Sequence, residues 1–206
     1  MADDRSARKH RGIMEAATAL FLRDGYRGTS MDAVAAAAEV SKQTVYAHFT
    51  DKTSLFTAIV ENTLDRTGGP IRTEIAALRD TADLRTDLRD LARGYLDAVM
   101  RPQVLALRRM IIGEAARQPG PARIYYGRAP ESTLAALAES FAHLDGRGLL
   151  RAPDPAVAAD HFAFLVLGLP LDKALFHVGD ALFTRTELRA HADAGAAAFL
   201  AAYGAA

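Results

Sequence analysis

The stretch from Thr29 to Lys52 constrains the fold of this chain more than any other segment. Its sequence, TSMDAVAAAAEVSKQTVYAHFTDK, predicts two short helices joined by a tight turn, followed by a polar helix face and a closing aromatic residue. A helix-turn-helix has this layout, and its second helix enters the major groove of DNA. The segment therefore points to a DNA-binding unit before any catalytic chemistry needs to be considered.

The second predicted helix begins after Ser41, a natural N-cap, and carries polar side chains in its first turn. Residues at this end of a recognition helix reach base edges: Lys suits guanine, Gln suits adenine, and a Thr methyl suits thymine. Other side chains suit phosphates, which set the register on the duplex, and the amides that open the preceding helix can bind another phosphate. The predicted DNA-contacting residues are Thr29, Ser30, Ser41, Lys42, Gln43, Thr44, Tyr46, His48 and Lys52.

The rest of the first half also predicts helices, because apolar residues recur at helical spacing and strand-like alternation is absent. A helix over residues 5–24 is expected to end at Gly25 in a left-handed C-cap. The Thr29–Asp32 segment predicts a variant capping box. A fourth helix covers residues 51–66, and the sequence Gly68-Gly69-Pro70 is expected to stop or kink it.

The second half continues in the same way. Pro102 is expected to open a helix that Pro119-Gly120-Pro121 closes, and another helix covers about residues 130–144. Asp154-Pro155 predicts the start of a helix over about 154–177, and a capping box at Thr184 and Glu187 predicts a last helix over about 184–203. The 154–177 helix is apolar nearly all round, so it needs cover on several sides, which suggests a partner subunit.

Composition excludes several classes of protein. The 206 residues suffice for one large or two small domains. Lys+Arg and Asp+Glu both number 25, and residues 1–55 carry 8 cations and 7 anions, a net charge of +1 (8 − 7), so any basic surface must be local. The absence of cysteine excludes disulfides and thiolate metal sites and suits a cytoplasmic protein. No apolar run of 18 residues and no signal-peptide centre is found, so no membrane span is expected.

No catalytic or metal-binding constellation is visible. The histidines lack an HxxxH spacing, and the Glu187/His191 pair is more typical of a helix surface than of a metal site. Phosphate-binding glycine loops, nucleophile elbows and clustered acid pairs are also missing. We therefore expect no enzyme, no cofactor and no metal.

The segment from Ile13 to Ile59 resembles the N-terminal domain of TetR-family (tetracycline repressor type) transcriptional regulators. Glu39 departs from the family pattern, which has a small residue, often glycine, in the turn, so Glu39 is expected to adopt a left-handed conformation. The back half resembles the AefR-like C-terminal subtype through Leu91-Ala92-Arg93, Tyr95-Leu96, Pro102, Ala106-Leu107-Arg108-Arg109 and Glu114-Ala115. The N-terminal resemblance rests on Ala16, Ala17, Leu20, Phe21, Gly25, Tyr26, Thr29, Ser30, Met31, Ala35, Val40, Ser41, Val45, Tyr46, His48, Phe49, Lys52 and Leu55.

The resemblance implies an all-α fold of about nine helices. It implies a three-helix helix-turn-helix DNA-binding domain over residues 1–53, a connecting fourth helix over 51–66, and a ligand-binding and dimerisation domain over 54–206. It further implies a homodimer formed through the helices at about 154–177 and 184–203, which binds a palindromic double-stranded DNA operator and is released by an unknown small molecule. The expected function is a transcriptional regulator, more a repressor than an activator. The alternative is a helical homodimeric interaction module that has lost operator recognition, which the near-neutral N-terminus and Glu39 favour.

Ligand contacts are harder to predict from the sequence. Ligand sites are mostly apolar cavities with a few polar groups, so aromatic, charged or soft side chains in apolar helices are candidates. An aromatic residue at helical spacing is, however, more often part of the core. The candidate ligand-contacting residues are Arg108, Met110, Tyr125, Phe141, His161, Phe164 and His177.

Overall fold

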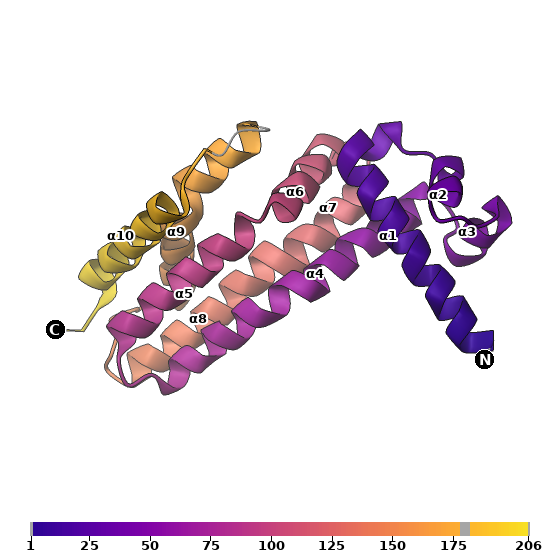
Figure 1. Cartoon of the computed structure of the whole chain (residues 1–206). Coiled ribbons are helices and arrows are strands. Elements are labelled where there is room, and N and C mark those ends of the chain that lie inside the picture. The colour runs from indigo at the N-terminus through magenta and orange to yellow at the C-terminus, as the bar shows by residue number, and fades with distance from the viewer. Residues whose placement is uncertain (1, 178–181, 206) are drawn as a thin grey trace. The chain divides into compact units, whose positions relative to one another are not determined.

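The computed structural model describes residues 2–177 and 182–205, and these fold into helices with no strand among them (Figure 1). The all-α class is therefore confirmed. The π-helical segment Gly127–Glu131 joins α7 to α8 without a break, so counting that run as one helix leaves nine in the described residues, as expected. The helices are α1 (Ala2–Gly28), α2 (Met31–Ala37), α3 (Lys42–His48), α4 (Lys52–Ala77), α5 (Leu84–Val99), α6 (Pro102–Glu114), α7 (Pro119–Tyr126), α8 (Ser132–Gly146), α9 (Pro155–Phe176) and α10 (Arg185–Tyr203), with a 3-10 turn at Leu78–Asp80.

The described residues form two compact units. The N-terminal unit comprises the chain up to Asp65 together with Ala106–Tyr126, and the C-terminal unit comprises Arg66–Leu105 and the residues from Gly127 onward. Helices α4 and α6 therefore contribute residues to both units. The expected DNA-binding domain, residues 1–53, lies within the N-terminal unit, and its functional boundary stays a prediction.

Most predicted helix starts are confirmed by side-chain caps. The Ser41 hydroxyl accepts a hydrogen bond from the Thr44 amide at 3.2 Å, which opens α3. Asp154 caps α9 by accepting from two amides of its first turn, each at 3.1 Å. At α10 the Glu187 amide donates to the Thr184 hydroxyl at 3.2 Å, and the Thr184 amide donates to the Glu187 carboxylate at 2.7 Å, so the predicted capping box is present.

The predictions around the first turn are confirmed in part. Gly25 has φ 73° and ψ 176°, a conformation essentially confined to glycine, and it interrupts the helical backbone of α1, which resumes beyond it and reaches Gly28. The predicted break is therefore present, but this ψ lies outside the left-handed helical region expected for a C-cap. The N-cap of α2 is Ser30, whose hydroxyl accepts from the Ala33 amide at 3.1 Å, and not Thr29.

Two predicted helix ends differ from the structure. Helix α4 continues through Pro70 to Ala77, because buried apolar residues on both sides of the proline, Leu64 and Ile71, hold the two halves in their cores. Pro119 does not close α6, which ends at Glu114, but opens α7. A proline is well tolerated at the first helical position, where its missing N–H would have no intrahelical partner.

The core of the N-terminal unit is centred on an aromatic cluster. The rings of Phe21, Tyr26 and Phe56 lie 5.2 to 5.8 Å apart between centroids. Val34 of α2 and Val45 of α3 are both fully buried, so each short helix is anchored by one apolar face. That anchoring leaves the opposite faces of α2 and α3 free to meet a ligand.

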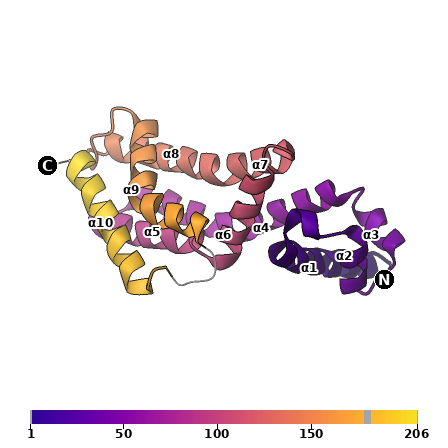
Figure 2. The ribbon, with the colours of Figure 1, turned by 90° about the horizontal axis from the view of Figure 1, so that it is seen from above.

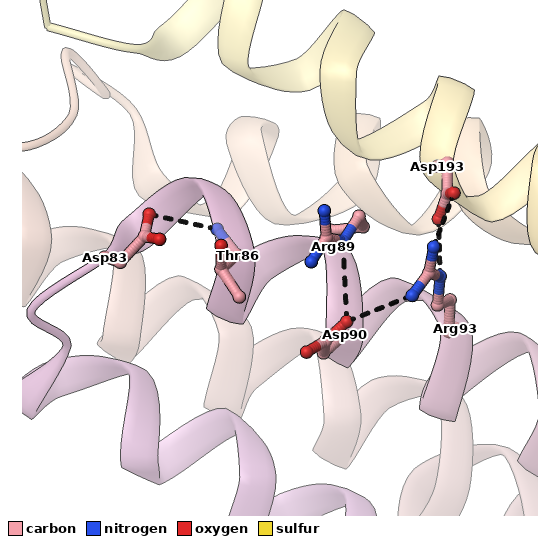
Figure 3. Close-up of polar contacts among 6 residues, drawn as sticks. All are labelled: Asp83, Thr86, Arg89, Asp90, Arg93 and Asp193. Carbon is pink, nitrogen blue, oxygen red and sulfur yellow. Dashed lines mark hydrogen bonds and ion pairs between the residues drawn. The ribbon is translucent and has the colours of Figure 1, made fainter.

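The C-terminal unit packs α5, α8, α9 and α10 against one another (Figure 2). A second aromatic cluster lies in the core between them. Phe141, Phe162 and Phe199 come from three different helices, are fully buried, and have ring centroids 4.9 to 5.7 Å apart. Polar contacts then tie α10 to α5: the Arg93 guanidinium donates two hydrogen bonds to Asp193, at 2.6 and 2.7 Å (Figure 3). These bonds lower the pKa of the Asp193 carboxyl and raise the pKa of Arg93.

Helix α9 differs from its neighbours in being apolar on almost every side. By length and composition it is the one helix among the described residues that could span a membrane, although no such segment was expected from the sequence. One face is buried, with Phe162 and Val166 inside the unit. Several other apolar residues of α9, among them Phe164 and Phe176, are exposed in the single chain.

Candidate nucleic-acid interface

The turn between α2 and α3 has the backbone geometry expected of a helix-turn-helix. The Val40 amide donates to the Ala35 carbonyl at 3.0 Å, and the Glu39 amide donates to the Ala36 carbonyl at 3.2 Å, which is a Schellman motif. Glu39 occupies the left-handed position of that motif with φ 53°, and it is the one non-glycine residue with positive φ in the described chain. The expectation for Glu39 is therefore confirmed, and the side chain does not prevent the turn.

The first turn of α3 lies on the surface. Ser41, Lys42 and Gln43 are exposed, whereas Thr44 is half-buried and its hydroxyl shares a 2.9 Å hydrogen bond with that of Ser41. Val45 points to the opposite side and is fully buried. The side chains predicted to reach base edges are therefore presented to solvent on a helix whose other face is fixed.

Lys42 is held by an ion pair that the sequence analysis did not predict. Its ammonium lies 2.7 Å from one carboxylate oxygen of Asp32 and 3.0 Å from the other. The hydrogen bond that Lys42 donates to Asp32 and the attraction of the carboxylate charge raise the pKa of Lys42. Asp32 lies ten residues earlier, in the first turn of α2, so no local spacing rule connects the two residues.

Two of the predicted phosphate contacts are engaged inside the unit. Thr29 is 2% exposed and its hydroxyl donates to the Gly25 carbonyl at 2.9 Å. The Lys52 ammonium donates to the carbonyls of Tyr26 and Thr29 at 2.9 and 3.0 Å and lies 4.5 Å from the centre of the Tyr26 ring. Two of its three N–H groups therefore tie the start of α4 to the corner between α1 and α2.

The remaining predicted contacts differ in exposure. Ser30 is exposed but its hydroxyl is used as the α2 cap, and Tyr46 is 45% exposed. His48 is half-buried, and its ring centroid lies 5.5 Å from that of His10 in α1. His10 thus lies beside the end of the recognition helix, a contact that its position in the sequence did not reveal.

A local basic surface lies on the first turns of α1. Arg5, Arg8, Lys9 and Arg11 are all exposed, and no acidic residue lies between them. The near-zero net charge of the chain requires any attraction to phosphate to come from such a local cluster.

The candidate ligand residues divide between the two units. In the N-terminal unit, the Arg108 guanidinium donates to the Tyr125 hydroxyl at 3.0 Å, and Met110 is half-buried on the same helix, α6. In the C-terminal unit, Phe141 belongs to the buried aromatic cluster, and Phe164 is 76% exposed.

Two histidines complete the candidate set. The His161 ring shares a 2.6 Å hydrogen bond with the Tyr203 hydroxyl on the exposed face of α9, and His177 is the exposed C-cap of that helix. Among the seven candidates, Arg108 and Tyr125 are brought together by a hydrogen bond, and the ligand-contacting set stays a prediction. Within the described residues, no group of three or more His, Asp or Glu side chains is placed to hold a metal ion.

Comparison with known families matches both halves of the chain. Residues 13–59 match the family described as "Bacterial regulatory proteins, tetR family", and residues 86–205 match "AefR-like transcriptional repressor, C-terminal domain". The chain belongs to the TetR family. It is therefore a DNA-binding transcriptional regulator and not an enzyme.

Solved TetR-family structures agree over nearly the whole chain. A TetR-family transcriptional regulator from Mesorhizobium loti is 42% identical, with 97% of this chain and 98% of that chain covered and a TM-score of 0.90. The flavonoid-responsive regulator FrrA is 33% identical to this chain, with 96% of this chain and 98% of the FrrA chain covered and a TM-score of 0.72. The expected AefR-like C-terminal domain and the N-terminal helix-turn-helix are thus confirmed together.

Two functionally named relatives match over shorter stretches. The transcriptional activator FasR of Mycolicibacterium smegmatis is 33% identical over 87 residues, which is 42% of this chain and 38% of FasR. The transcriptional repressor SCO4008 of Streptomyces coelicolor is 43% identical over 60 residues, which is 29% of this chain and 31% of SCO4008. The matched regions span about a third of each relative, and their names cover both directions of regulation.

Proposed function

We propose that this TetR-family regulator is a cytoplasmic homodimeric repressor that binds a palindromic operator and leaves it when a small molecule binds. The observation that carries the proposal is the exposed first turn of α3, where Lys42 and Gln43 stand on a helix anchored by buried Val45. Side chains at this position of a recognition helix reach base edges in the major groove. The AefR-like match of the second half supports repression over activation.

The exposed faces of α9 and α10 support a homodimer. Phe164 and Phe176 are 76% and 81% exposed on α9, which is unusual for phenylalanine in a folded protein. Helix α10 carries an exposed stripe of alanines, including Ala194, Ala197 and Ala201, which lets a second helix approach closely. Burial of these faces against a second copy sets the two recognition helices at the spacing of successive major grooves, about 34–36 Å.

Contacts inside the N-terminal unit support ligand control. Arg108 and Tyr125 lie in the same compact unit as the helix-turn-helix. The Arg27 guanidinium lies 3.4 Å from the Glu114 carboxylate, and the Thr53 hydroxyl donates to the Gln118 side-chain carbonyl at 3.3 Å. A ligand that shifts α6 or α7 therefore acts on α1 and α4 directly. A coupling of about 1–3 kcal/mol changes DNA affinity about 5- to 150-fold.

The test begins with DNA selection by the wild-type protein from a library of duplexes with a randomised core. We expect an enriched palindrome and a salt-sensitive complex with it. The Gln43→Ala change should relax specificity at one base pair in each half-site, at a cost of about 1–3 kcal/mol, whereas Tyr46→Ala should weaken binding to all sequences about equally. Selection of no sequence at low salt, by a protein that is still dimeric, would instead support the interaction-module alternative.

Ligand response is tested by thermal shift followed by gel shift. Because FrrA is named flavonoid-responsive and is similar over its whole length, flavonoids are the first class in the screen. A compound that binds the native state raises the unfolding temperature. The same compound should dissociate the selected duplex, and a compound that stabilises the protein without affecting DNA binding would count against ligand-controlled release.

A further inference from the structure

The ion pair between Asp32 and Lys42 joins the two helices of the motif at their first turns. Lys42 lies in the first turn of α3, and Asp32 lies in the first turn of α2. The ammonium contacts both carboxylate oxygens, at 2.7 and 3.0 Å. The carboxylate therefore fixes the position of the Lys42 charge relative to both helices.

The pair is exposed enough to exchange partners. The side chains of Lys42 and Asp32 are 59% and 65% exposed. Ion pairs at this exposure contribute little to stability, so the fold does not depend on it. The pair is instead placed where an incoming duplex meets it, if α3 reads DNA as proposed.

The two kinds of acceptor on DNA respond differently to such a pair. A phosphate oxygen is anionic, so it must approach against the Asp32 carboxylate or displace it from Lys42. The O6 and N7 acceptors of guanine carry no net charge, so they can accept a hydrogen bond from Lys42 while the carboxylate stays in place. The carboxylate therefore penalises the backbone contact more than the base contact.

We propose that Asp32 is a specificity-determining residue that directs the Lys42 ammonium away from phosphates and toward base edges. This inference rests on the proposed reading of DNA by α3. Without the carboxylate, Lys42 would engage the nearest phosphate on any sequence, and sequence-independent binding would rise.

The experiment compares Asp32→Asn with wild type on two probes: the duplex selected by the wild-type protein, and poly(dI-dC) as nonspecific DNA. One additional phosphate contact steepens the slope of log K against log salt by about 0.9. The affinity of Asp32→Asn for poly(dI-dC) should therefore fall about 3.5-fold more than that of wild type between about 50 and 200 mM salt. The ratio of selected to nonspecific affinity should be smaller for the variant at every salt concentration.

Two further variants separate this role from simpler ones. Asp24→Asn removes the same charge from the same unit, but its carboxylate pairs with Arg23 and not with Lys42. It should leave the ratio between the probes unchanged. In a Lys42→Met background, Asp32→Asn should no longer steepen the salt slope, because the contact it releases is absent.

The outcomes are distinguishable. If Asp32→Asn and Asp24→Asn change the ratio of selected to nonspecific affinity equally, Asp32 acts only through the net charge of the unit, and the inference is wrong. Equal weakening of both probes by Asp32→Asn, together with a lower unfolding temperature, would assign it a structural role and also overturn it. If the wild-type protein selects no sequence, the proposed function fails first and the inference falls with it.

Discussion

The close spacing between α9 and α10 requires a residue without a Cβ atom at position 195, which is Gly195. A Cβ atom placed there would lie 2.8 Å from the carbonyl oxygen of Leu165 and 3.0 Å from its carbonyl carbon. Both are backbone atoms in the middle of α9, so they cannot rotate away, and α10 has to move outward. Such overpacking typically costs about 1–3 kcal/mol, whereas replacing a mid-helix glycine by alanine gains about 1 kcal/mol in helix propensity. We expect Gly195→Ala to lower the free energy of unfolding by about 1 kcal/mol.

Gly94→Ala in α5 is the matched control. A Cβ at Gly94 would meet Glu74 at 2.7 Å, but the atom it meets is the terminal carboxylate oxygen of an exposed, flexible side chain. Glu74 can turn aside, so the propensity gain should dominate, and Gly94→Ala should raise the free energy of unfolding by up to about 1 kcal/mol. The same substitution thus has opposite signs in two helices of one unit.

Urea unfolding followed by circular dichroism measures both variants, at one protein concentration because dimerisation contributes to apparent stability. Gel filtration of Gly195→Ala adds a second readout, since a displaced α10 alters the surface proposed to face the second copy. If Gly195→Ala proves as stable as Gly94→Ala, the α9–α10 distance relaxes at no cost and the argument from backbone contact is wrong.

Three further predictions concern the C-terminal unit. Phe164→Glu should convert the dimer to a monomer in analytical ultracentrifugation. The control Tyr126→Glu, at another exposed aromatic residue, on α7, should leave the protein dimeric. Dissociation by both variants would argue against α9 as the interface. Asp193→Asn should lower the unfolding temperature at pH 7, because Arg93 stabilises the ionised carboxylate and so lowers the pKa of Asp193. The difference in unfolding temperature between variant and wild type should shrink as the pH falls below 3.8, the ordinary pKa of an aspartate, because the wild-type carboxylate is then protonated. A difference that persists at lower pH would contradict the ion-pair explanation. Thr184→Ala should cost about 1 kcal/mol in urea unfolding through loss of the α10 cap, and no measurable change would mean that the cap is replaced by water.

Local chemistry in the sequence was enough to predict the class, the motif and most helix starts. Ser41, Asp154 and Thr184 cap their helices as predicted, because a cap involves a side chain and amides two or three residues away. The left-handed Glu39 followed from the family resemblance, because the family has a small residue, often glycine, at that position of the turn. The exposure of Lys42 and Gln43 followed from the apolar residues on the other side of the same short helix.

Contacts between segments distant in the chain were decided only by the tertiary structure. The sequence Gly68-Gly69-Pro70 was expected to stop or kink a helix near residue 66, yet α4 continues to Ala77, with buried residues on both sides of the proline. Lys52 was expected to meet phosphate, yet two of its N–H groups bind carbonyls more than twenty residues earlier. Asp32 was expected only as part of a local capping box, yet it contacts Lys42 across ten residues. A sequence pattern reports what a residue does within its own helix, whereas its partners depend on how helices pack, and packing is settled by the whole buried surface at once.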